Sequence, residues 1–228
     1  MKTKIPHFIF AGLFAVTTAS QGASIAITNF SFQADDQGGD GGLSVATPTG
    51  WTNLGGILGT INFNAGARYT TADADDANPS GGTIGDMDGN QALFTINNGG
   101  VSQTLGDSIV VGNLYTMTVA IGDHDAGNRA GFSGYDIRLL AGGSTVASIS
   151  STTTPGDGTF TDVSFSYTAQ AGDSGLLGIE LIEINGGSGK AVDFDNVRLS
   201  FTSFVPEPSS TALLGLGCLA IALRRKRS

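Results

Sequence analysis

Two aspartates, Asp193 and Asp195, lie in the segment Val192 to Phe201 (VDFDNVRLSF), whose alternating pattern predicts the last β-strand of the chain. Side chains along a strand point alternately to its two faces, so both aspartates are expected to share a face with Val197 and Leu199. These apolar residues mark that face as the core. Asp195 is therefore expected to point inward, where an unpaired carboxylate is costly. It needs either a cation or several hydrogen-bond donors, such as the backbone N–H groups of a turn.

Other residue patterns offer little for catalysis. His124 is the only histidine between residues 24 and 204, so a catalytic triad there has one available base, and a metal site with two histidines is impossible. No G-x-S-x-G nucleophile elbow is present, and the nearest segment is GFSG at residues 131–134. A carboxylate pair for glycoside hydrolysis stays open, because acidic residues are plentiful. This inventory predicts that the protein is not an enzyme, with a glycan-active hydrolase as the least favoured alternative.

Residues that could bind a sugar are also present. Sugar rings stack on exposed aromatic faces, and their hydroxyl groups bond to amides, carboxylates and guanidinium groups. The aromatic candidates are Trp51, Tyr69, Phe132 and Tyr135, and core packing is the alternative role of Trp51 and Tyr135. The polar candidates share one loop and are Asp123, Asp125, Asn128 and Arg129. Loops on a β-sandwich often carry binding residues, which favours the polar group.

Acidic residues are concentrated in the central part of the chain. Residues 24–204 contain 19 acidic and 5 basic residues, a net charge of −14, whereas the whole chain has −9. Such a surface repels nucleic acid and anionic lipid, so no nucleic-acid partner is expected, and it suits divalent cations and neutral glycans. The only cysteine is Cys218, so this part has no disulfide. Bound calcium is an attractive way to hold its loops, and solubility is the simpler explanation of its charge.

The remaining elements are short segments of alternating or β-branched residues between glycine-rich turns. With 35 glycines and 14 % charged residues, the composition fits many strands joined by turns. No helical period and no fixed repeat occurs between residues 24 and 204. We therefore predict one all-β domain, an antiparallel β-sandwich of the jelly-roll type. The expected strands are 24–32, 57–63, 91–96, 114–121, 134–140, 145–150, 159–167, 176–184 and 192–201.

The first 23 residues predict a signal peptide with a short apolar helix. Lys2 and Lys4 provide a positive start, Ile5 to Val16 an apolar run, and residues 17–23 a small-residue exit where signal peptidase could cut. The alternative is a buried N-terminal helix. Removal of this segment leaves residues 24–204 as the exported domain.

Residues 205–228 form a second distinctive end. A Pro-Glu-Pro triplet precedes an apolar run from about Thr211 to Leu223, which predicts a hydrophobic helix shorter than the ~20 residues needed to span a bilayer. Basic residues close the chain and would stay on the cytoplasmic side. The residues of the triplet and the basic cluster are Pro206, Glu207, Pro208, Arg224, Arg225, Lys226 and Arg227.

This order resembles the PEP-CTERM sorting tail of bacterial exported proteins. The resemblance implies export, transient anchoring in the inner membrane, and cleavage near the Pro-Glu-Pro triplet by an exosortase-type transpeptidase. The final location would be the cell surface or the extracellular matrix.

Short motifs also recur through the central domain, at Pro48–Trp51, Gln103–Leu105, Tyr115–Val119, Tyr135–Gly143 and Phe194–Leu199. Their order is similar to that of galactose-binding-like jelly rolls, the fold of many carbohydrate-binding modules. In such modules an aspartate at the position of Asp195 commonly belongs to a structural calcium site, with oxygen ligands from an early loop. The resemblance thus implies Ca²⁺ as a structural cofactor. Its further ligands would be Asp35, Asp36 and Asp40, or Asp86 and Asp88.

Together these observations predict an exported, exosortase-processed surface or extracellular-matrix protein that is non-catalytic and associated with exopolysaccharide. The alternative is a carbohydrate-binding module with a defined sugar site. An exposed aromatic platform beside polar loops would favour that alternative.

Overall fold

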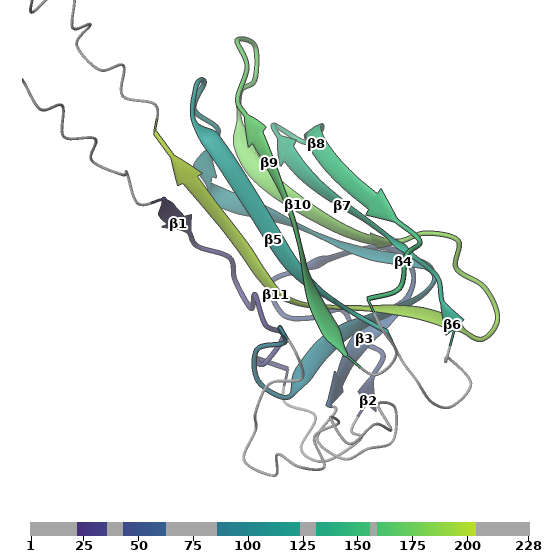
Figure 1. The fold of residues 1–228 in the computed structure, drawn as a ribbon. Helices are drawn as coiled ribbons and strands as arrows, with labels where there is room; N and C mark the ends of the chain where they lie inside the picture. The colour runs from purple at the N-terminus through teal and green to yellow at the C-terminus, as the bar shows by residue number, and fades with distance from the viewer. Residues whose placement is uncertain (1–21, 36–42, 63–85, 124–130, 156–158, 204–228) are drawn as a thin grey trace, which may run out of the picture.

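The computed structural model of the chain describes residues 22–35, 43–62, 86–123, 131–155 and 159–203. These residues form eleven β-strands and no α-helix (Figure 1). The all-β prediction is confirmed for this part of the chain. The predicted signal helix and C-terminal helix lie outside it, and within it no helix is long and apolar enough to cross a membrane.

The strands vary widely in length. The two longest, β4 and β11, are neighbours in the middle of the sheet. In chain order the strands are β1 (Ala23–Ile25), β2 (Leu43–Ser44), β3 (Thr52–Asn62), β4 (Gln91–Ser108), β5 (Leu114–Gly122), β6 (Gly131–Phe132), β7 (Tyr135–Ala141), β8 (Ser144–Ser151), β9 (Phe160–Thr168), β10 (Leu176–Glu183) and β11 (Lys190–Thr202).

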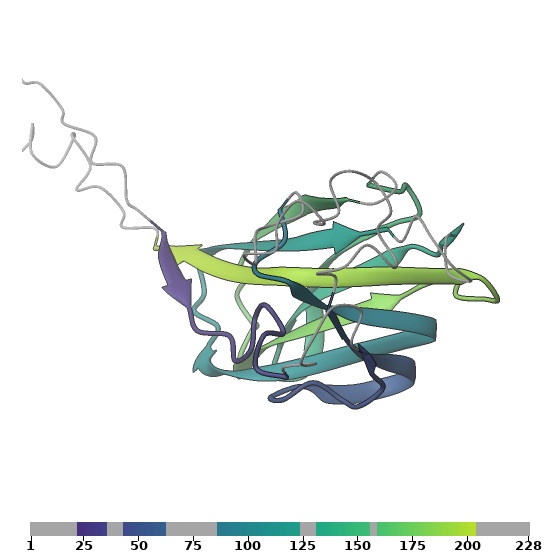
Figure 2. The same cartoon turned by 90° about the horizontal axis from the view of Figure 1, so that it is seen from below.

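The sheet curls over on itself to enclose one main core. Its strands are hydrogen-bonded in the order β8-β7-β10-β4-β11-β5-β9. The first half of β4 pairs with β11 and the second half with β10, so β7 and β10 face β5 and β11 across the core (Figures 1 and 2). These pairs are antiparallel, as predicted, and the short β6 differs because it pairs with β11 in parallel.

β4 crosses between the layers at Asn97 and Asn98, which have left-handed φ angles of 59° and 57°. Asparagine tolerates this conformation better than most residues. Glu183, buried at the end of β10, accepts hydrogen bonds from the backbone N–H groups of Asn98 (2.7 Å) and Gly99 (3.4 Å). In β3, Gly56 follows the bend with a φ of 71°, and a Cβ atom there would lie 2.4 Å from the Cα atom of Gly99. The predicted strand 91–96 therefore continues through the bend to Ser108.

A bulge in β11 corrects the predicted facing of Asp193 and Asp195. The pairing of β11 with β5 shifts register after Asp195, and Asn196 has a φ of 47°. Strict alternation fails across this bulge, so the two aspartates lie on the face opposite to the one that was predicted. Both are nevertheless buried. The β11 residues that do lie in the main core are Val192, Phe194, Val197 and Leu199.

The first predicted strand is also shorter than expected. Only Ala23–Ile25 form β1, because Asn29 and Phe32 take left-handed φ angles of 50° and 56° and turn the chain. β1 pairs antiparallel with the end of β11, with Ala23 opposite Phe201. The two ends of the described domain therefore lie side by side (Figures 1 and 2).

Candidate functional site

The strongest candidate site is the β11 acid pair, Asp193 and Asp195. Neither residue has exposed surface. Since they are two residues apart in one strand, their Cα atoms lie about 6.6 Å apart and their side chains point to the same face. This face is opposite to the main core.

Strand pairing places an aromatic residue on either side of Asp193. Asp193 lies opposite Phe94 of β4 and opposite Gly122 of β5. Gly122 in turn lies opposite Phe160 of β9. Residues directly opposite each other share a face of the sheet. One row across four strands therefore carries two aromatic rings and a carboxyl group, and Gly122 adds no side chain to it.

Asp195 lies in the next row, opposite Ala120 of β5. Its Oδ2 atom accepts a 2.6 Å hydrogen bond from the backbone N–H of Asp88, and its Oδ1 atom has no hydrogen-bond partner among the described residues. Burial raises the pKa of Asp195 well above its ordinary value, and the N–H groups of Asp88 and Asn196 oppose this only in part. The group is thus a carboxylic acid that holds its proton unusually well.

The turn whose backbone N–H donates to Asp195 is held by hydrogen bonds from two other parts of the chain. The Gln33 side-chain amide donates to the carbonyl oxygens of Asp88 (3.0 Å) and Gln91 (2.9 Å). The Asn196 side-chain amide donates to the carbonyl oxygen of Asp86 at 2.9 Å. These contacts fix the backbone N–H that bonds to Asp195.

Apolar residues share this face of the sheet with the acid pair. They form a second cluster on this face of the sheet, consisting of Ile61, Met87, Ala92, Phe94, Ile96, Ala120, Phe160 and Ala191. A carboxylic acid in apolar surroundings can act as a proton donor at a pH where an ordinary one is ionised. Aromatic faces and a carboxylate nearby can stabilise a positive charge. The arrangement is therefore suited to acid-initiated reactions through cations.

The predicted calcium ligands are not brought together as a complete set. Asp35 accepts hydrogen bonds from Asn29 and Thr49, and Asp86 accepts one from the backbone N–H of Asp162. No group of three or more acidic, histidine or cysteine side chains with metal-binding geometry occurs in the described ranges. Asp36 and Asp40 lie outside those ranges. A backbone N–H occupies one carboxyl oxygen of Asp195, and calcium at this residue stays a prediction of the sequence.

Among the predicted sugar-binding residues that the structure describes, Trp51, Asp123 and Tyr135 are buried. Trp51 and Tyr135 are core residues, so neither forms an exposed aromatic platform, and their rings pack against Phe32 (5.5 Å between centroids) and Phe132 (6.4 Å). Asp123 is buried and accepts a 2.6 Å hydrogen bond from Thr154. The other candidates, Tyr69, Asp125, Asn128 and Arg129, lie outside the described residues, as does the whole tail from Pro206 to Arg227.

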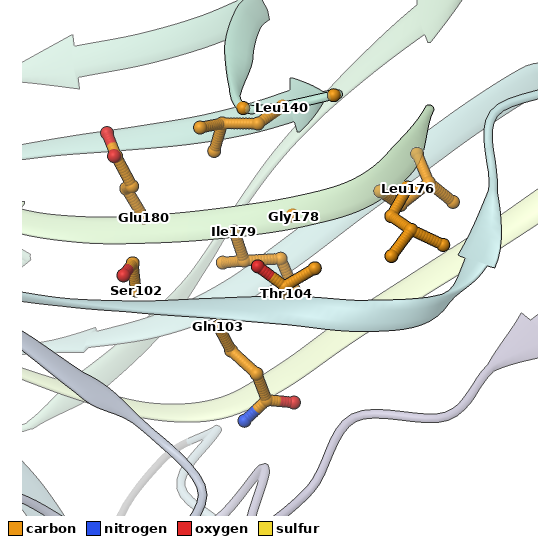
Figure 3. A pocket seen from close by; sticks show the side chains of 11 residues that line it. Ser102, Gln103, Thr104, Leu140, Leu176, Gly178, Ile179 and Glu180 are labelled. Carbon is orange, nitrogen blue, oxygen red and sulfur yellow. The ribbon is translucent and has the colours of Figure 1, made fainter. Parts of the chain in front are cut away.

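A hollow separate from the acid pair, the β10 groove, has a volume of about 440 Å³ and lies over β4, β7 and β10 (Figure 3). Hydroxyl groups of Ser102 and Thr104 and the carboxylate of Glu180 line it, with Leu140 and Leu176 as its apolar part. Figure 3 shows Gln103 pointing away from these side chains. Gln103 instead bonds to the backbone of the N-terminal segment at Thr28.

Three residues of the acid site, Phe94, Gly122 and Phe160, were missed by sequence reasoning. The rows that join them to Asp193 depend on the register of four strands that are distant in the chain. A single sequence carries no signal for that register. The one available clue is the double aspartate in an otherwise apolar strand.

The comparisons with known proteins assign a family to the described domain and a sorting motif to the tail. The family model described as HpiC1 cyclase matches residues 23–200. The chain belongs to the HpiC1-like family. A second family model, the PEP-CTERM protein-sorting motif, matches residues 204–227 and confirms the predicted sorting tail. The protein is thus exported and processed by an exosortase.

Two solved cyclase structures share the fold. A Stig cyclase, Fisc, from Fischerella sp. TAU in complex with (3Z)-3-(1-methyl-2-pyrrolidinylidene)-3H-indole is 23 % identical, with a TM-score of 0.66, over 81 % of this chain and 100 % of that chain. A Fischerella sp. TAU cyclase with 4-(1H-indol-3-yl)butan-2-one is 24 % identical, with a TM-score of 0.62, over 80 % and 99 %. The CBM22-1 xylan-binding domain of Paenibacillus barcinonensis Xyn10C is 14 % identical, with a TM-score of 0.42, over 83 % and 100 %. No curated protein matches the chain.

Membership of the HpiC1-like family overturns the prediction that the protein is not an enzyme. That prediction rested on the absence of a nucleophile elbow and of paired histidines. Chemistry carried by buried carboxyl groups needs neither of them, and the pair that could carry it becomes recognisable only when the strands are in register.

Proposed function

We propose that the exported domain is a cyclase that uses the β11 acid pair for acid–base chemistry on an unsaturated, aromatic substrate. The observation that carries this proposal is the placement of two buried carboxyl groups on one strand face, with Phe94 and Phe160 in the row of Asp193. Membership of the HpiC1-like family supports it.

Each group has a role that its surroundings favour. Asp195, whose pKa is raised by burial, donates its proton to a double bond of the substrate and creates a carbocation. The carboxyl group of Asp193 and the two aromatic rings stabilise the positive charge while the ring closes. The loss of a proton from the cyclised cation returns the acid to its starting state. The reaction is an isomerisation and consumes no other reactant.

Relatives suggest the class of substrate. The two Fischerella cyclase complexes hold indole compounds. An aromatic heterocycle of that size has the flat, polarisable surface that rings such as Phe94 and Phe160 favour. We therefore propose an aromatic heterocycle with an unsaturated side chain as the substrate. Because the acid pair has no exposed surface, substrate binding must displace part of what covers it.

The experiment is a binding and conversion assay of the full chain with the two indole compounds and with unsaturated indole analogues. Cyclisation leaves the molecular mass unchanged, so the product is recognised by a changed chromatographic retention time at constant mass. Asp193→Asn and Asp195→Asn are expected to lower the rate about 10²-fold or more, the usual contribution of a general acid or base. Asp107→Asn, which alters an exposed acid of β4, is the control and keeps the rate. Conversion that survives both Asn variants would contradict the proposal.

The finer steps of export belong to the same proposal. We infer that signal peptidase removes residues 1–23, that the tail then holds the protein transiently in the inner membrane, and that exosortase cleavage near Pro206–Pro208 releases it to the cell surface or matrix. Mass spectrometry of the released protein gives both cleavage sites. Glu207→Ala is expected to leave the tail attached, and release of this variant at the normal mass would contradict the role of the triplet.

A second candidate function is contact with a neutral exopolysaccharide in the β10 groove. Ser102, Thr104 and Glu180 supply the polar atoms that sugar hydroxyl groups need. No aromatic ring lines this groove, which ranks the candidate second. Affinity electrophoresis through a gel containing the polysaccharide tests it. Thr104→Val is expected to abolish any retardation, and Asp107→Asn to preserve it; equal mobility with and without polysaccharide would exclude the candidate.

A further inference from the structure

We infer that the end of the sandwich from which both termini leave is a membrane-contact surface. It is formed by exposed apolar side chains that we call the apolar tip: Val110, Val111, Leu114 and Leu176. The inference rests on the transient anchoring proposed above. It adds that the folded domain itself, and not the tail alone, touches the lipid.

The apolar tip stands out because its members are grouped. Val110 and Val111 are 54 % and 53 % exposed, and Leu176 and Leu114 are 45 % and 37 % exposed. Single exposed apolar residues are ordinary on protein surfaces, whereas a group of them marks a contact site. Leu114 begins β5 and Leu176 begins β10 beside the end of β4, so all four lie at one end of the molecule (Figure 1).

The exposure of the two valines is imposed by a well-ordered turn. The N–H of Asn113 donates to the carbonyl oxygen of Val110 at 3.2 Å, and Gly112 has the φ of 86° that such a turn requires. The N–H of Val110 donates to the Tyr115 hydroxyl oxygen at 2.8 Å. Turn residues are usually glycine, proline, asparagine, aspartate or serine. Two valines at the apex of a braced turn therefore present an apolar surface outward.

The apolar tip is also next to the anchors. Leu114 lies opposite Thr202, the last residue of β11, and Ala23 lies opposite Phe201. The apolar run of the tail begins at Thr211, nine residues after Thr202. An extended chain of that length spans at most about 32 Å. A tail inserted in the bilayer thus keeps this end of the domain beside the membrane and directs the opposite end away from it.

The contact is apolar rather than electrostatic. The two segments that form the tip, residues 109–114 and 169–177, contain Asp173 and neither lysine nor arginine. Attraction to anionic headgroups requires basic residues. The contact of the apolar tip is therefore expected to form on phosphatidylcholine vesicles, which carry no anionic headgroups.

The experiment uses the full chain in phosphatidylcholine vesicles. Val111→Cys is labelled with a polarity-sensitive fluorophore in a Cys218→Ser background, which removes the only native cysteine. The matched control is Val45→Cys, which is 70 % exposed and follows β2, near the opposite end of β4. We expect the fluorescence emission of the label at position 111 to shift to shorter wavelength. We also expect this fluorescence to be quenched by lipid carrying a doxyl group near the headgroup. The label at position 45 is expected to be quenched only by aqueous iodide. Val110→Asp, next to the label, should abolish the doxyl quenching, and Val45→Asp should not.

Two results would overturn the inference. One is equal iodide quenching at positions 111 and 45 without doxyl quenching, which would mean that the tip stays in water. The other is a label at position 111 that neither quencher reaches, which would mean that the tail or a second copy covers the tip. Vesicle flotation is measured on the same samples. Failure to float with the vesicles contradicts the proposed anchoring, whereas flotation without doxyl quenching contradicts only the contact proposed here.

Discussion

The carboxyl group of Asp195 and the backbone N–H of Asp88 are 107 residues apart in the chain and are joined by a 2.6 Å hydrogen bond. This bond ties the turn after residue 85 to the bulged strand β11. It also leaves the other oxygen of a fully buried carboxyl group, Oδ1, without a hydrogen-bond partner in the described part of the chain. The protonation state of Asp195 is thereby linked both to the fold and to the proposed acid chemistry.

Asp195 is expected to make stability depend on pH in a defined direction. Because burial raises its pKa in the folded state, the folded protein keeps this proton at a pH where the unfolded chain has lost it. This stabilisation of the folded state is complete below the ordinary aspartate pKa of 3.8. It is lost as the pH rises through the raised pKa of Asp195. The melting temperature of the wild type, minus that of Asp195→Asn, is therefore expected to fall over this window.

The control is Asp107→Asn, which changes an exposed acid of β4 and leaves the carboxyl group of Asp195 in place. A wild-type advantage over Asp195→Asn that grows with pH would contradict the prediction. It would mean that the ionised form is the stabilising one, as calcium binding requires. Repeating the melts in calcium and in excess chelator then decides whether a cation is responsible.

Glu183 is expected to hold the bend of β4. Its carboxylate accepts the N–H groups of Asn98 and Gly99 where β4 crosses between layers. Glu183→Ala removes this acceptor and should lower the free energy of unfolding by about 1–3 kcal/mol, the cost of a buried unsatisfied polar group. Glu183→Gln keeps an acceptor oxygen and should lose less. Urea unfolding measures both, and equal losses would mean that charge or packing, and not hydrogen bonding, is what Glu183 supplies.

Asn196 is expected to be replaceable by glycine but not by a β-branched residue. Its φ of 47° allows the bulge that turns Asp193 and Asp195 away from the main core. A side chain branched at Cβ is strained there by about 1–2 kcal/mol. Melting temperatures should fall in the order wild type, Asn196→Gly, Asn196→Val. Both variants lie below the wild type because they lose the hydrogen bond to Asp86, and Asn196→Val lies lowest because it adds the strain. Ser200→Val in the same strand is the control. A variant Asn196→Val as stable as Asn196→Gly would show that the bulge relaxes.

The bulge at Asn196 also marks the limit of prediction from the sequence. Alternation predicted most of the strands, because a strand with one buried face repeats every two residues. β5 is an example, with Tyr115, Met117 and Val119 buried in turn. Alternation also predicted that Asp195 is buried. It assigned the wrong face because Asn196 adds a residue to the strand, and bulges have no reliable sequence pattern.

The acid site was even less accessible to prediction. Asp193 and Phe160 share a face because Gly122 is opposite both of them. Such a relationship depends on long-range pairing and not on local preference, so no reading of one segment can supply it. The sorting tail was predictable for the opposite reason. Its signal lies in a continuous run of residues that is recognised without a folded structure.

Arg138 is expected to stabilise β7 and β10 through two carboxylates. Its Nε atom donates to Asp136 Oδ2 at 2.7 Å, and its NH1 group donates to Glu180 Oε2 at 3.2 Å. The hydrogen bond and charge of Asp136 raise the pKa of Arg138, which favours the charged form of the arginine. The side chain is 37 % exposed, which limits the loss in Arg138→Met to about 1 kcal/mol of unfolding free energy. Arg138→Lys keeps the charge but not the planar fork of the guanidinium group, so it should recover only part of the lost unfolding free energy.

Because the ion pairs of Arg138 are partly screened, the difference in unfolding free energy between wild type and Arg138→Met should shrink from low salt to 1 M salt. A difference independent of salt would assign the effect to packing of the arginine stem.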